Sequence, residues 1–186
     1  MVKITKALFD GFLPELEYSE DWEQWVTLFS SGTCIYCWDM FGKIFRIGEE
    51  PEQIPPVHEN CGCEIIPLLS VLVGNATING ESGADYWLFQ YGHLPDYYIG
   101  KEEAKSLGWE SWRGNLGSVL PGRMIGGSIF WNRNEKLPSK VGRIWYEADI
   151  NYQKGYRNLH RVVYSNDGLI FVTYDHYMTF VAVRSA

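Results

Sequence analysis

Residues 143–150 alternate between two kinds of side chain, and this alternation strongly constrains the fold. One set of alternate positions is mostly polar and comprises Arg143, Trp145, Glu147 and Asp149. The other set is apolar enough to form core and comprises Ile144, Tyr146, Ala148 and Ile150. Successive side chains of a strand point to opposite faces of a sheet. The segment is therefore predicted to be a strand with one buried face and one face that carries carboxylates beside a cation.

Two further arginines and a histidine follow on segments that also read as short strands, up to Phe180. Arg157, Arg161 and His176 lie between Gly, Asn and Asp residues, which favour turns. A carboxylate, arginines and an imidazole that converge on one sheet face suit acid–base catalysis on a phosphodiester.

Helical segments precede these strands. Helices are predicted over 84–91, stopped by Gly92, over 101–107, followed by Gly108, and as a short turn over 116–119. From Met124 onward the segments are short, aromatic and β-branched. Helices first and strands afterwards predict an α+β fold with an antiparallel sheet.

Several ordered motifs between about residues 84 and 184 carry a family resemblance. They include ADYW at 84–87, LPDYYI at 94–99, IGGSIFWNR at 125–133, WYEADINY at 145–152 and DHY at 175–177. This part of the chain resembles the small bacterial ribonucleases of the barnase type. The resemblance implies the microbial ribonuclease fold, in which N-terminal helices pack on a C-terminal antiparallel β-sheet.

The same resemblance implies a metal-independent endoribonuclease toxin. Such an enzyme cleaves RNA by attack of the 2′-hydroxyl, which forms a 2′,3′-cyclic phosphate that is then hydrolysed. By resemblance, Glu147 is the general base and His176 the general acid. Arg157, Arg161 and Lys101 are expected to hold the phosphate oxygens, a task that suits the planar fork of arginine. The resemblance also implies an acidic, barstar-like immunity protein as a partner besides the RNA substrate.

The base-binding residues expected from the resemblance are Phe130, Trp131, Asn132, Arg133 and Tyr177. In the family, the loop after the IGG-x-IF motif reads guanine through backbone groups and an acidic side chain. Here the acidic position falls on Asn134, and Glu135 follows one residue later. Trp131 and Tyr177 are candidates to stack on a base, and an exposed aromatic at a domain contact is an equally good interpretation of Trp131. The base preference stays open.

A cluster of cysteines and one histidine lies near the other end of the chain. Its members are Cys34, Cys37, His58, Cys61 and Cys63, and these include all four cysteines. Thiolates and a neutral imidazole suit tetrahedral zinc, which needs four of these five ligands. Two disulfides and reduced structural thiols are the alternatives.

The segment from about 33 to 66, with Gly42 and Pro55–Pro56 between the two halves of the cluster, resembles the C-terminal Cys/His motif of phage Mu F-type minor head proteins. That resemblance implies the end of a longer protein, secreted or delivered by a phage-like particle, whose toxin acts in the cytoplasm of the target cell. It also supplies the alternative function, a non-enzymatic head or delivery module with an inert ribonuclease-like half.

The net charge of −7 is divided unevenly. Residues 1–74 hold four basic and 12 acidic residues, a formal charge of −8, and residues 75–186 hold 12 basic and 11 acidic ones, +1. With the cysteine distribution, this split predicts two units, a Cys/His-rich unit over 1–74 and a ribonuclease-like unit over 75–186, joined near Gly74–Gly83. The whole-chain charge alone would disfavour a nucleic-acid partner, but the split leaves room for a cationic cleft that the acidic unit is expected to mask.

No membrane association is expected, because the longest apolar run, Ile65–Val73, is interrupted by Pro67 and Ser70 and is far shorter than the about 20 residues that span a bilayer. No signal sequence opens the chain.

Overall fold

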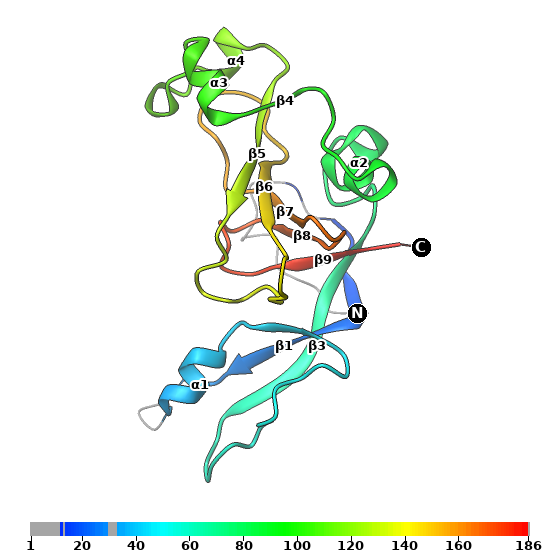
Figure 1. Cartoon of the computed structure of the whole chain (residues 1–186), viewed down its shortest axis with the longest axis vertical. Helices are drawn as coiled ribbons and strands as arrows, with labels where there is room; N and C mark the ends of the chain where they lie inside the picture. Colours follow the sequence, from blue (N-terminus) through cyan, green and yellow to red (C-terminus); the bar gives the residue numbers. More distant parts are fainter. Residues whose placement is uncertain (1–11, 13, 30–32, 186) are drawn as a thin grey trace.

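The computed structural model describes residues 12, 14–29 and 33–185. These residues form one nine-stranded sheet with short helices around it (Figure 1). The strands are β1 Glu17–Thr27, β2 Ile44–Arg46, β3 Cys63–Leu72, β4 Tyr98–Ile99, β5 Met124–Phe130, β6 Trp145–Asp149, β7 Arg161–Ser165, β8 Ile170–Thr173 and β9 Val181–Arg184. The helices are α1 Ile35–Met40, α2 Ala84–Tyr91, α3 Lys101–Ser106 and α4 Leu116–Val119, with 3-10 turns η1 Gly80–Ser82 and η2 Ser111–Arg113.

The predicted α+β class is confirmed, but the sheet is mixed rather than antiparallel throughout. The strand order is β2-β1-β3-β9-β8-β7-β6-β5-β4, in which β5 to β9 pair antiparallel. Two pairs, β4 with β5 and β3 with β9, are parallel. A parallel pair needs a long crossover between its strands. For β3 and β9 that crossover is the whole of the intervening chain, α2 to β8, so their pairing could not be read from local sequence.

Helices α2, α3 and α4 lie within the segments that the sequence predicts to be helical. Helix α2 ends at Gly92, whose φ of 74° is the left-handed conformation that glycine adopts without strain. Helices α3 and α4 fall within the predicted segments 101–107 and 116–119. No helix in the described part of the chain is long and apolar enough to cross a membrane.

Hydrophobic clusters lie on both faces of the sheet. One face carries two predicted core residues, Ala148 of β6 and Ile150 just after it, which pack with Ala84 and Leu88 of α2. The other face, which carries the polar set, is packed over part of its area. Its cluster comprises Trp22, Ile44, Leu68, Leu137, Trp145, Val163, Phe171, Phe180 and Ala182.

Strands from both predicted units, 1–74 and 75–186, therefore pair in one sheet and share that second cluster. Trp22, Ile44 and Leu68 come from the first unit, and Trp145 and Phe171 from the second. Ile144, expected on the core face of the strand, precedes β6 and is 43% exposed.

Candidate active site

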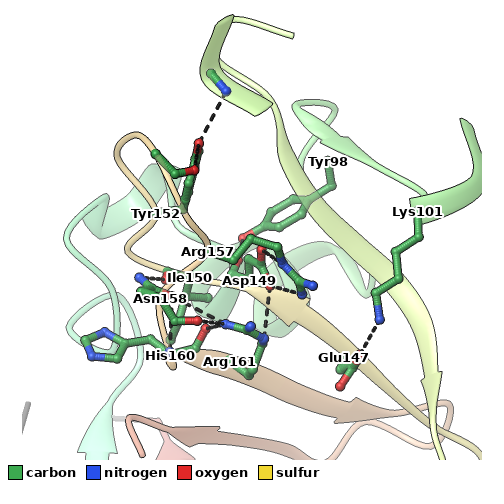
Figure 2. Close-up of polar contacts among 12 residues, drawn as sticks. Tyr98, Lys101, Glu147, Asp149, Ile150, Tyr152, Arg157, Asn158, His160 and Arg161 are labelled. Carbon is green, nitrogen blue, oxygen red and sulfur yellow. Dashed lines mark hydrogen bonds and ion pairs between the residues drawn. The ribbon is translucent and has the colours of Figure 1, made fainter. Parts of the chain in front are cut away.

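Glu147 lies in the middle of β6, and two side chains hold its carboxylate. Lys101 Nζ, at the start of α3, donates to Glu147 Oε1 at 2.9 Å (Figure 2). The hydroxyl of Tyr177, in the loop after β8, donates to Glu147 Oε2. The Glu147 side chain is 14% exposed, so the carboxylate is poorly solvated and depends on these two donors.

The balance of these effects keeps Glu147 ionised. Burial alone raises the pKa of the carboxyl, but the hydrogen bonds from Tyr177 and Lys101 and the charges of Lys101 and Arg161 outweigh it. The net pKa of Glu147 lies below its ordinary value, so the group is a carboxylate, and hence a proton acceptor, at neutral pH.

A pocket of about 670 Å³ brings Glu147 together with most of the other predicted site residues. Its lining includes two further predicted catalytic side chains, Lys101 and His176. It also includes all five predicted base-binding residues, Phe130, Trp131, Asn132, Arg133 and Tyr177. Every lining residue comes from the 75–186 range, so among the described residues the expected masking by the acidic unit finds no support in this lining.

His176 sits on a tightly bonded loop between β8 and β9. Asp175 accepts hydrogen bonds from the hydroxyls of Thr173, at 2.9 Å, and Thr179, at 2.6 Å. His176 and Tyr177 have φ values of 58° and 70°, a left-handed conformation that is costly for residues with a Cβ. The loop thus holds a strained backbone conformation at His176, whose exposed side chain lines the pocket.

Arg157 and Arg161 share one buried partner, Asp149 at the end of β6. Arg157 binds it through two hydrogen bonds of 2.6 Å, from Nε to Oδ2 and from Nη2 to Oδ1 (Figure 2). Arg161 Nε lies 3.0 Å from Asp149 Oδ1, within ion-pair distance although not aligned as a hydrogen bond. Asp149 is completely buried, so the two guanidinium groups take the place of water around its carboxylate.

The two arginines do not line the pocket itself. Their charges nevertheless act on it. Burial lowers the pKa of Arg157, but Asp149, and to a smaller extent Glu147, outweigh this and raise it. The charge of Arg161 is one of the smaller effects that lower the pKa of Glu147. The structure therefore places the arginines behind the carboxylate, with Asp149 fixing their orientation.

The predicted base-recognition loop, residues 130–135, is braced by contacts to Leu137, two residues beyond it. The Asn132 amide donates to Leu137 O at 2.8 Å, and its Oδ1 accepts from Leu137 N at 3.1 Å. The Phe130 ring stacks on Tyr177 with centroids 5.1 Å apart. Trp131, by contrast, is 71% exposed. The Asn132 side chain thus shapes the loop, and Trp131 presents a free aromatic surface.

The five candidate metal ligands also converge, around Cys37. The Cys37 sulfur lies 3.4 Å from Cys34 Sγ, 3.6 Å from His58 Nε2 and 3.8 Å from Cys61 Sγ. Cys63 groups with Cys37 and Cys61. All four cysteines are free, and these sulfur separations exceed the about 2.05 Å of a disulfide bond.

The cluster fits zinc by its donors and spacing. Thiolates about 2.3 Å from a tetrahedral zinc ion are about 3.8 Å apart, close to the sulfur separations here. His58 Nδ1 lies 2.9 Å from Glu59 O, which favours the tautomer that leaves Nε2 as a ligand. The thiols differ in acidity. Burial raises the pKa of Cys61, but hydrogen bonds from the backbone and from neighbouring thiols outweigh it and bring the pKa to about 7, whereas burial raises the pKa of Cys37 above its ordinary value.

The α+β fold and a pocket that combines a carboxylate, an imidazole and an ammonium group are typical of nucleases that use acid–base catalysis. Comparison with known proteins agrees. A family model described as ribonuclease matches residues 85–184. Ribonucleases from Heyndrickxia coagulans, Bacillus intermedius and Bacillus pumilus are each 52% identical to the chain over 109 residues, which is 59% of the chain. The match covers 100% of the first protein and 67% of each of the other two.

The chain therefore belongs to the ribonuclease family, and the predicted enzyme class, an endoribonuclease, is confirmed. Residues 1–84 lie outside the family match.

Sequence reasoning missed two contacts of the site. Tyr177 was expected to stack on a base, but it also donates to Glu147. Asp149 is not among the predicted site residues, yet it pairs with both Arg157 and Arg161. Its position was a usable signal, because a carboxylate two residues after Glu147 lies on the same strand face.

Proposed function

We propose that the chain cleaves RNA by transesterification at the 2′-hydroxyl, followed by hydrolysis of the 2′,3′-cyclic phosphate. The observation that carries this proposal is the ionised Glu147, held by Lys101 and Tyr177 in the same pocket as the His176 imidazole. A base and an acid in one pocket are what the first step needs, since RNA brings its own nucleophile.

In the first step, Glu147 takes the proton of the 2′-hydroxyl as its oxygen bonds to phosphorus. The bond from phosphorus to the 5′-oxygen breaks, and His176 gives its proton to that oxygen. In the second step the roles reverse: His176 takes a proton from water, the water oxygen bonds to phosphorus, and Glu147 returns its proton to the departing 2′-oxygen. Lys101, Arg157 and Arg161 stabilise the negative charge on the phosphate oxygens. No step calls for a metal ion.

The Cys/His cluster is proposed as a structural zinc site, in which four of Cys34, Cys37, His58, Cys61 and Cys63 hold the ion. Bound zinc would supply folding energy to the N-terminal unit and take no part in cleavage. The rest of the biological role follows from resemblance. It comprises a toxin carried behind a phage-head-like unit, action in the cytoplasm of a target cell, and inhibition by an acidic immunity protein.

The test is cleavage of RNA by the purified full chain, with product ends identified by mass spectrometry. We expect 2′,3′-cyclic phosphate ends in early products. Glu147→Gln and His176→Ala should each lower kcat by about 10²- to 10⁴-fold, the usual contribution of general acid–base catalysis.

Glu102→Gln is the matched control, because Glu102 is an exposed carboxylate on α3 whose partner is Lys105. It should retain full activity. Cleavage that survives in both active-site variants, or products without cyclic ends, would refute the mechanism. A folded chain with no cleavage at all would favour the inert delivery module.

A further inference from the structure

The turn Gly42–Ile44 of the N-terminal unit contacts the predicted base-recognition loop directly. Ile44 N donates to Lys136 O at 2.8 Å. Lys43 Nζ lies 3.4 Å from Glu135 Oε2 and also donates to Asp39 Oδ2 at 2.7 Å. The Lys43 side chain is only 14% exposed, whereas the Glu135 side chain is 69% exposed, so water screens this ion pair on the Glu135 side. The turn thus offers the loop a backbone hydrogen bond and a charge.

The turn is itself held firmly on β1. Trp25 N donates to Lys43 O at 3.0 Å, and Gly42 N donates to Trp25 O at 2.9 Å. Trp25 is fully buried, in the cluster that contains Cys37, Met40 and Cys63. The turn therefore connects this packed cluster to the base-recognition loop.

Lys136 extends this contact to the loop that carries His176. Its ammonium donates to Met178 O at 2.7 Å, and the side chain lines the pocket. The same side chain passes over Gly42: a Cβ on Gly42 would lie 3.2 Å from Lys136 Cε. The Lys136 side chain therefore lies against the N-terminal turn, and its ammonium group binds the loop that carries His176.

Both loops contain residues in the left-handed conformation. Asn132 and Glu135 have φ values of 44° and 49°, and His176 and Tyr177 lie in the same region. Residues other than glycine persist in this conformation only where the surroundings hold them. The contacts of Gly42, Lys43 and Ile44 supply support of this kind from outside the family domain.

We infer that the turn Gly42–Ile44 is a positioning element of the active site, which sets the base preference and the rate through Lys136 and Glu135. The inference rests on the proposed function for its kinetic readout. It assigns to the N-terminal unit a part in specificity, exercised through backbone placement without a residue in the pocket.

Two glycines allow a matched test in the full chain. Gly42 and Gly48 both lie in the N-terminal unit and have φ values of 79° and 88°, so alanine is strained at either position. A Cβ at Gly48 meets nothing within 4 Å, whereas one at Gly42 meets Lys136. Gly42→Ala and Gly48→Ala should therefore lower the melting temperature similarly, while only Gly42→Ala displaces the Lys136 side chain, which binds Met178 O.

The measurement is kcat and KM for dinucleoside phosphates with guanine or adenine on the 5′ side. Gly42→Ala should lower kcat/KM by roughly two- to threefold, since Lys136 must give by a few tenths of an ångström and a displacement of about 1 Å can cost about 10²-fold, and it should change the guanine-to-adenine ratio. Gly48→Ala should leave both unchanged. Equal effects of the two variants on the ratio would overturn the inference.

Exchanging the charges of Lys43 and Glu135 tests the same inference without replacing a glycine. Lys43→Glu should alter the base ratio, and Lys43→Glu combined with Glu135→Lys should restore it towards the wild-type value. A double variant no better than the single one would count against positioning by this pair.

Amide NMR separates the inference from the proposed function. In Gly42→Ala, signals of residues 132–137 and 176–178 should shift, and in Gly48→Ala they should not. A wild-type chain that cleaves no RNA would refute the proposed function, and the NMR comparison would still decide whether the turn positions the loops. Unmoved loop signals in Gly42→Ala would overturn the inference in either case.

Discussion

Replacing Asp149 by asparagine should destabilise the protein more than any single loss of an exposed ion pair. Asp149→Asn keeps the shape of the side chain but removes the charge that two arginines share. Arg161 is 4% exposed and cannot turn its guanidinium into water, whereas the Arg157 side chain is 23% exposed and can do so in part. The variant therefore leaves Arg161 buried without a paired carboxylate, and among the described residues only the oxygens of Asn158 and His160 then accept from its guanidinium.

The magnitude follows from the contacts. A hydrogen bond to a charged group contributes about 1.5–3 kcal/mol, and Arg157 makes two of them. The amide oxygen of asparagine retains part of this, while the unpaired Arg161 adds a desolvation cost. Breaking a buried pair in this way costs about 3–5 kcal/mol. For a chain of this length, that is a fall in melting temperature of about 6–20 °C.

The assay is urea denaturation with calorimetry as a second probe. Glu102→Gln again serves as the control, because its pair with Lys105 is exposed and is expected to contribute at most about 0.5 kcal/mol. Below the melting temperature, Asp149→Asn should also lower kcat/KM, because both arginines lose their orientation. A variant that loses no more stability than Glu102→Gln would refute the view that Asp149 is the anchor of the site.

Three further outcomes are expected. Tyr177→Phe removes a hydrogen bond that lowers the pKa of Glu147, so the acid limb of kcat/KM should move to higher pH. An unmoved limb would mean that the carboxylate is held by other groups. Arg143 holds the pKa of Asp167 at about 2, so its contribution to stability is present above the ordinary value of 3.8 and is lost as pH falls towards 2. The difference in stability between wild type and Asp167→Asn should therefore shrink over that range, and a constant difference would exclude this ion pair as its source. Chelation should lower the melting temperature without abolishing cleavage by the folded chain, and metal analysis before and after treatment would show whether zinc was released. A chelator that stops cleavage with the fold intact would contradict a purely structural metal.

Local patterns predicted the parts of the fold that local forces decide. The glycine after Tyr91 ends α2, and the alternation around Glu147 produces β6 with Ala148 and Ile150 in the core. These features depend on backbone conformation and on the period of the side chains, both of which can be read from neighbouring residues.

The interactions that sequence could not predict join segments far apart in the chain. Trp145 belongs to the mostly polar alternate set, yet it packs in one cluster with Trp22 and Ile44, because β3 pairs with β9. The convergence of Lys101, Glu147 and Tyr177 likewise depends on how a helix, a strand and a loop meet. Their residue types suggested acid–base chemistry, while the pattern of donors around the carboxylate emerged only from the tertiary structure.

The pairing of β3 with β9 has a consequence for how the protein is made. Strand β3 is translated before its partner β9, and all of α2 to β8 lies between them in the chain. Until β9 follows, the β3 edge is an unpaired strand that can recruit other chains. Closing such a distant contact is entropically slow. Because the same closing step completes the core beneath Trp145, an incomplete chain lacks the packed face on which Glu147 stands. Nascent chains should therefore be inert towards the RNA of the cell that makes them.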